Sequence, residues 1–95
     1  MVDEGARNPE KAYEVSREIV TTEEGKDLLI TVRDGERWAK FRYSYRQRSG
    51  TVRKDREPAE SSGKVGTLLK RELRDAADEE YNRLMKEDPG FFKNS

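Results

Sequence analysis

The chain of 95 residues contains no cysteine and no histidine. Without cysteine it has no disulfide framework and no thiolate nucleophile. Without histidine it lacks the commonest metal ligand and the commonest general base in proteins. The sequence therefore predicts a non-enzymatic binding protein with no catalytic residues, no metal site and no cofactor.

Long apolar runs are absent as well. No segment approaches the roughly 20 consecutive apolar residues that a membrane-spanning helix needs. The opening residues Met1-Val2-Asp3-Glu4 lack the basic and then apolar layout of a signal peptide. We expect a cytoplasmic protein that has no membrane contact.

Apolar residues are scarce, at 32% of the chain against 42% charged residues. Such a balance favours disorder unless the apolar residues fall in a regular pattern, which they do here. A chain of this length suits one domain with a thin core. We expect that single domain at residues 12–87, between a polar N-terminal tail at 1–11 and a C-terminal tail at 88–95.

The β-branched residues between Tyr13 and Thr22 favour a strand, with Tyr13, Val15 and Ile19 all at odd positions. A competing signal is Asn8-Pro9, which is typical of a helix start and would make residues 9–20 helical. We favour the strand and keep the helix as the alternative.

Three turn signals follow, and each fixes the register of a hairpin. The predicted turns are Glu24-Gly25, Asp34-Gly35 and Ser49-Gly50, which pair Ile19 with Ile30, Ile30 with Ala39 and Gln47 with Val52. All three registers place apolar residues on one shared face. That predicted core face comprises Tyr13, Val15, Ile19, Leu28, Ile30, Val32, Ala39, Phe41, Tyr43, Tyr45 and Val52.

After a polar connection at 58–63, which we expect to be mobile, the apolar period changes to three and four residues. This spacing predicts one amphipathic helix at about 64–87. The predicted strands are 12–22, 26–33, 36–48 and 51–57. The fold class is therefore α+β, a four-stranded antiparallel meander with a long C-terminal helix packed on one face (ββββα); the alternative is αβββα.

Two details stay open at this stage. Glu80 falls inside the apolar stripe of the helix, and we favour a position at the helix edge in solvent. The alternative is an ion pair with one of the basic residues on the core face of the sheet, which are Arg17, Arg37, Lys54 and Arg56. Phe91-Phe92, after the helix stop at Pro89-Gly90, either folds back as a clasp, which we favour, or stays free as a docking segment.

The net charge is zero, yet residues 37–56 contain eight basic side chains and one acidic one, Asp55. Alternation along the third strand places many of these cations opposite the core face, beside the single tryptophan. The candidate nucleic-acid-binding residues are Trp38, Lys40, Arg42, Arg46, Arg48 and Arg53. Cations neutralise phosphates, and an exposed ring offers a base a stacking platform.

We therefore hypothesise that this face binds single-stranded or structured nucleic acid, with a possible homodimer enlarging the thin core. The hypothesis requires Arg42 and Arg46 to be free of acidic partners from the same chain. The alternative is a protein-interaction module or inhibitor that docks on a partner protein, because Trp, Tyr and Arg also predominate at interface hot spots. A solvated sheet face with ordinary charge alternation is the simplest interpretation.

Phosphate binding through a P-loop is excluded. Ser62-Gly63-Lys64 precedes the predicted helix, but Pro58 stands where that motif needs glycine, and Val65 stands where it needs Ser or Thr.

Overall fold

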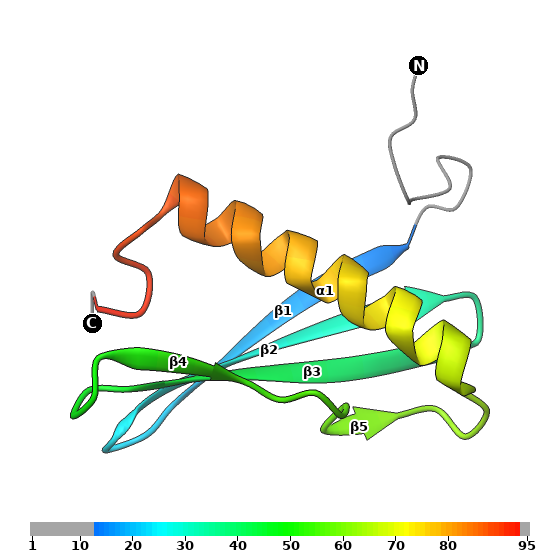
Figure 1. The fold of residues 1–95 in the computed structure, drawn as a ribbon, viewed down its shortest axis with the longest axis horizontal. Helices are drawn as coiled ribbons and strands as arrows, with labels where there is room; N and C mark the ends of the chain where they lie inside the picture. The colour runs from blue at the N-terminus through cyan, green and yellow to red at the C-terminus, as the bar shows by residue number, and fades with distance from the viewer. Residues whose placement is uncertain (1–12, 94–95) are drawn as a thin grey trace.

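The computed structural model describes residues 13–93, so the predicted tail at 1–11 lies outside the described residues. The elements in chain order are β1 (Glu14–Thr21), β2 (Gly25–Asp34), β3 (Arg37–Arg46), β4 (Thr51–Lys54), β5 (Glu60–Ser61) and α1 (Thr67–Glu87). The sheet is antiparallel with strand order β1-β2-β3-β4, and β5 pairs with β3 (Figure 1). The predicted α+β meander with one C-terminal helix is confirmed. The αβββα alternative is wrong, because Glu14–Thr21 is a strand.

Each hairpin differs from its predicted register by two residues. Ile19 pairs with Leu28, Ile30 pairs with Phe41, and Tyr45 pairs with Val52. Side chains alternate between the faces of a strand with a period of two, so a shift of two residues leaves every side chain on its predicted face. The apolar face was therefore predicted correctly from three wrong pairings.

Gly25 explains one of these shifts. It is not a turn residue but the first residue of β2, where it is buried opposite Arg46. A Cβ at this position would lie 1.9 Å from the carbonyl oxygen of Tyr45, so only glycine fits. The turn lies before it, and the hydroxyl of Thr22 accepts hydrogen bonds from the N–H groups of Glu24 and Gly25.

The connection after β4 is docked along β3, contrary to the predicted mobile segment at 58–63. The N–H groups of Asp55, Ala59 and Ser62 donate to carbonyl groups of β3 at 3.1, 2.7 and 2.9 Å. Strand β4 ends at Lys54, directly before Asp55, rather than at the predicted residue 57, and β5 resumes the pairing after Ala59. The connection thereby satisfies the backbone groups on the outer side of β3.

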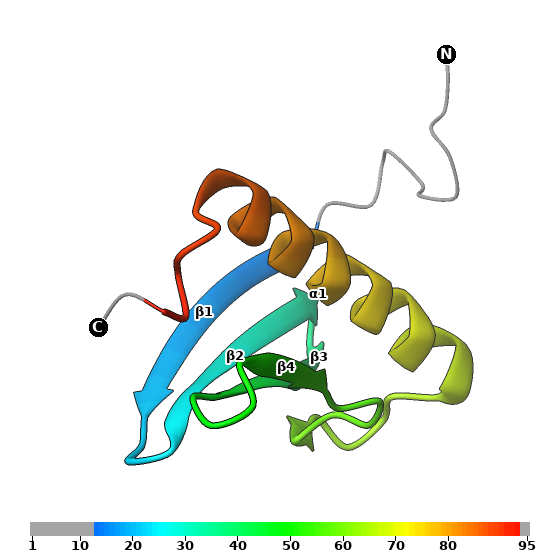
Figure 2. The same cartoon turned by 60° about the vertical axis from the view of Figure 1, so that its left-hand side comes forward.

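The core lies between α1 and the central strands. The helix begins at Thr67, three residues later than predicted, and packs on β2 and β3 (Figure 2). Its buried residues are Leu73, Ala76, Ala77, Tyr81 and Leu84, which face Leu28, Ile30, Val32, Ala39, Phe41, Tyr43 and Tyr45 of the sheet. No helix among the described residues is long and apolar enough to cross a membrane.

Glu80 and the segment Phe91-Phe92, whose positions the sequence left open, both contact the rest of the domain. Phe92 is buried and stacks on Tyr45 at 5.5 Å between ring centroids, so the C-terminal segment forms the predicted clasp. The Glu80 side chain is only 11% exposed, and its carboxylate lies 3.5 Å from Nε of Arg17 and also contacts Arg83. The ion pair between the layers is therefore present, and the favoured position of Glu80 at the helix edge in solvent is wrong.

Candidate interaction surfaces

We call the side of the sheet that faces away from α1 the open face. Strand β3 contributes Trp38, Lys40, Arg42 and Arg46 to it, because these residues alternate with buried core residues, and β4 contributes Arg53. Arg48, the sixth residue of the predicted site, lies off the sheet, in the turn that joins β3 to β4. The structure thus brings together five of the six predicted residues.

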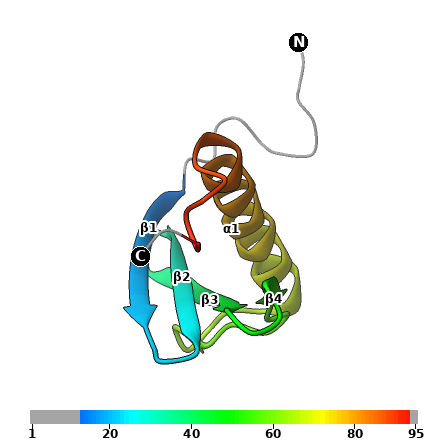
Figure 3. The same cartoon turned by 90° about the vertical axis from the view of Figure 1, so that its left-hand side faces the viewer.

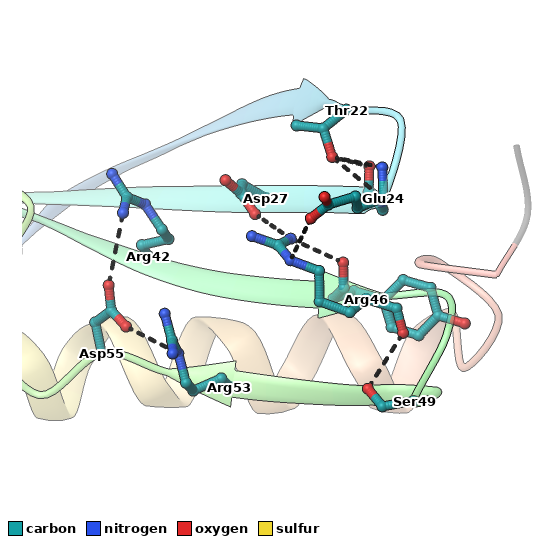
Figure 4. Close-up of polar contacts among 10 residues, drawn as sticks. Thr22, Glu24, Asp27, Arg42, Arg46, Ser49, Arg53 and Asp55 are labelled. Carbon is teal, nitrogen blue, oxygen red and sulfur yellow. Dashed lines mark hydrogen bonds and ion pairs between the residues drawn. The ribbon is translucent and has the colours of Figure 1, made fainter.

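Arg42 and Arg53 share one carboxylate on this face. Asp55 lies 3.8 Å from Arg42 and 3.7 Å from Arg53, with one carboxylate oxygen directed to each guanidinium. Figure 4 shows the Asp55 carboxylate joined to both arginine side chains. Asp55 is held there by the backbone, because its N–H donates to the carbonyl of Arg42 at 3.1 Å.

Arg46 and Lys40 each have two acidic neighbours. Arg46 donates to Asp27 at 3.0 Å and lies 3.9 Å from Glu24 (Figure 4). Lys40 lies 3.5 Å from Glu18 of β1 and 3.7 Å from Glu60 of β5. These contacts connect β3 to every other strand except β4 through the side chains of the open face.

The open face is therefore balanced in charge rather than basic. The count for residues 37–56 includes Asp55 but misses four acids that come from other segments and that the fold places beside β3, namely Glu18, Glu24, Asp27 and Glu60. The requirement of the nucleic-acid hypothesis, that Arg42 and Arg46 have no acidic partners in the chain, is not met. A phosphate group would have to displace a carboxylate from each of these cations. Nucleic-acid binding stays an untested prediction.

A second surface, the outer edge of β1, was not predicted as a site. All eight residues of β1 are exposed, and no described residue pairs with its outer edge (Figure 3). Of the four exposed large hydrophobic residues within 13–93, three lie on β1: Val15 is 39%, Ile19 50% and Val20 40% exposed. The fourth, Leu68, lies on the helix.

Val15 and Ile19 were expected in the core, and this prediction is wrong in burial although right in face. They pair with Val32 and Leu28 of β2 and lie on the helix side of the sheet. A helix is about 10 Å across and strands lie about 4.8 Å apart, so one helix covers about two strands. α1 covers β2 and β3, and the edge strand remains outside. This width argument is the signal in the sequence that would have found the surface.

The outer edge of β1 carries few of the features that usually prevent strand pairing. The pairing with β2 continues through all eight residues without a bulge, and the segment contains neither proline nor lysine. The opposite side of the sheet is different, because β4 has four residues and β5 two. Within the described residues, β1 is the long strand edge that is left open.

No three or more Asp and Glu side chains within residues 13–93 are grouped so as to hold a metal ion. Comparison with known proteins gives no family model, no curated protein and no solved structure that matches this chain.

Proposed function

We propose that this protein is a non-enzymatic interaction module that binds another protein through the outer edge of β1. The partner contributes an extended segment that pairs with β1 and lengthens the sheet by one strand. One observation supports this proposal above the others: β1 has an eight-residue edge with which no described residue pairs, and the strand also presents three exposed aliphatic side chains.

The backbone supplies the affinity in this form of binding. Each strand directs its N–H and C=O groups alternately to its two sides, and only the groups on the inner side of β1 are used by β2. The outer groups form a template for a further strand. When a partner strand pairs with β1, these outer groups give up their hydrogen bonds to water and form hydrogen bonds with the backbone of the partner.

The side chains supply the selectivity. Val15 and Ile19 stand on the helix side of β1, and Val20 stands on the open face. An added strand would place its own side chains beside these residues at about 4.5–5.5 Å between Cβ atoms. A partner segment with aliphatic residues at alternate positions therefore fits best.

Selection from a library of random displayed peptides against the immobilised chain tests the proposal. We expect enriched peptides to carry alternating aliphatic residues and to slow the hydrogen exchange of amides in β1. Replacement of both edge residues, Val15→Glu with Ile19→Glu, should abolish binding of these peptides, because buried carboxylates would face the partner strand.

The matched control is Leu68→Glu, which makes the same kind of change at an exposed aliphatic residue of α1 that is 73% exposed. This variant should bind the peptides as the parent chain does. Peptides that bind equally well to the chain with both edge replacements would place the site elsewhere and end the proposal.

A further inference from the structure

We infer that the partner at the β1 edge is a second copy of this chain, joined in an antiparallel pair with its two-fold axis at Arg17. This inference rests on the proposed use of the β1 edge. The two four-stranded meanders would form one continuous sheet, with both helices on the same face.

The sequence of β1 is complementary to itself about Arg17. In a two-fold antiparallel pair, each residue opposes one from the same face of the strand, so the axis passes midway between the two copies of one residue. With the axis at Arg17, Val15 of each copy opposes Ile19 of the other. Both exposed aliphatic residues of the helix side thereby meet an aliphatic partner, twice in the dimer.

Neighbouring registers lack this match. An axis at Ser16 opposes Val15 with Arg17, and an axis at Glu18 opposes Ile19 with Arg17. On the open face, the Arg17 axis opposes Glu18 with Ser16 and Val20 with Glu14, so no like charges meet there. The axis at Arg17 keeps residues 14–20 of both copies paired, which are seven of the eight residues of β1.

The axis itself brings two Arg17 side chains together, and the structure already contains their counter-charge. Each guanidinium lies 3.5 Å from Glu80 of its own helix, whose carboxylate is largely buried. Pairing would bring the two ion pairs near each other rather than two bare cations. At longer range the copies do not repel, because the net charge of the chain is zero.

The helix leaves room for the second copy. α1 packs on β2 and β3, whereas its contacts with the β1 side run through the long side chains of Tyr13 and Arg17. Figure 3 shows β1 at the margin of the sheet, displaced sideways from α1. The two joined β1 strands would therefore form the part of the sheet that lies between the two helices.

Sedimentation velocity of the full chain over a concentration series tests the inference. The parent chain should reach the mass of a dimer, and so should Leu68→Glu. The chain carrying Val15→Glu and Ile19→Glu should stay monomeric, with self-association weakened about tenfold or more because like charges face each other in both pairs. Circular dichroism checks that each variant keeps its fold.

A charge-swapped chain tests the register. Val15→Glu combined with Ile19→Lys places opposite charges across both pairs only if position 15 opposes position 19. This chain should dimerise, although it carries as many edge charges as the monomeric variant. If it is monomeric while Leu68→Glu dimerises, the Arg17 register is wrong.

Two other outcomes would overturn the inference. A dimer that survives the paired glutamate replacements has its interface elsewhere. A parent chain that is monomeric at every concentration has no self-partner; the peptide selection then decides independently whether the β1 edge binds a different protein. Failure of both experiments removes the proposed function as well.

Discussion

Tyr43 is the residue at which sheet and helix are joined most closely. Its ring is buried in the sheet and stacks on Tyr81 of α1, with 4.6 Å between centroids and 6° between ring planes. Its hydroxyl donates to Asp78 of the same helix at 2.8 Å. Burial, followed by the hydrogen bond to Asp78, raises the pKa of Tyr43 above its ordinary value. One side chain thus combines apolar packing with a charge-assisted hydrogen bond.

Replacing Tyr43 with phenylalanine should lower the free energy of unfolding by about 1–2 kcal/mol at neutral pH, because the ring stays but the hydrogen bond to Asp78 is lost. Urea unfolding measures the change. The matched control is Tyr45→Phe, since Tyr45 is also buried but its hydroxyl has no hydrogen bond among the described residues. Equal losses in the two variants would show that the Asp78 contact adds nothing.

The raised pKa of Tyr43 also predicts how this difference changes with pH. In the unfolded chain the hydroxyl loses its proton near pH 10, whereas the folded chain holds it to higher pH. The stabilisation is therefore complete below about pH 10 and declines above it. The difference in the free energy of unfolding between Tyr43→Phe and the parent should become smaller in alkali. A difference that stays constant would contradict the assignment.

At the scale of elements, hydrophobic alternation is strong enough to predict the faces but not the pairings. Three registers were wrong by two residues, and for the first hairpin the reason is that glycine has more than one use in a hairpin. At Gly35 and Gly50 it adopts a φ of +68° within a turn, whereas at Gly25 it allows the close approach of Tyr45. The dipeptide Glu-Gly by itself does not indicate whether the glycine lies in the turn or allows a close approach of the neighbouring strand.

Burial depends on a neighbour's width, which local patterns do not contain. The same alternation placed Ile30 and Ile19 on one face, yet Ile30 is fully buried and Ile19 is half exposed. Similarly, the basic segment predicted a basic face, but Asp27 and Glu18 reach that face from other strands. The candidate site depended on which strands became neighbours, so it was the less predictable part.

The docked connection is tied to α1 by one exposed ion pair. Lys70, in the first turns of the helix, donates to Glu57 at 2.7 Å. This hydrogen bond, together with the charge of Lys70, lowers the pKa of Glu57. The pair fixes the path of the chain between β4 and the helix start, where Gly66 provides no side-chain cap.

Glu57→Gln should therefore lower stability slightly at neutral pH and leave it unchanged in acid. A lowered pKa in the folded chain gives stabilisation that is complete above the unfolded value of about 4.3 and disappears as the pH falls through the folded value. Urea midpoints across this range measure it. The control is Glu87→Gln, since Glu87 has no ion pair with any described residue. If Glu57→Gln stays less stable than the parent in acid, the ion pair with Lys70 is excluded as the cause of its lower stability.

For the whole molecule, the distribution of charge decides between polyanion binding and protein binding. The chain has 20 basic and 20 acidic residues, and the fold mixes them across the open face rather than separating them. Nucleic-acid affinity rises with the number of phosphates that free cations neutralise, and each neutralised phosphate releases condensed counterions. Protein cations that already contact carboxylates neutralise few phosphates, so few counterions are released.

We therefore expect no saturable binding of a random single-stranded oligonucleotide at low salt. Trp38, the single tryptophan, is half-buried on the open face, so its fluorescence would report a base stacked there.

Nucleic-acid binding by the open face would give a different result: binding that falls steeply with salt and collapses in the Arg42→Glu, Arg46→Glu variant while the fold persists. A matched chain with Arg71→Glu and Arg83→Glu changes the same number of charges on α1. Collapse in the first variant alone would mean that phosphates displace Asp55 and Asp27 from these arginines, and the open face would then be the functional surface in place of the β1 edge.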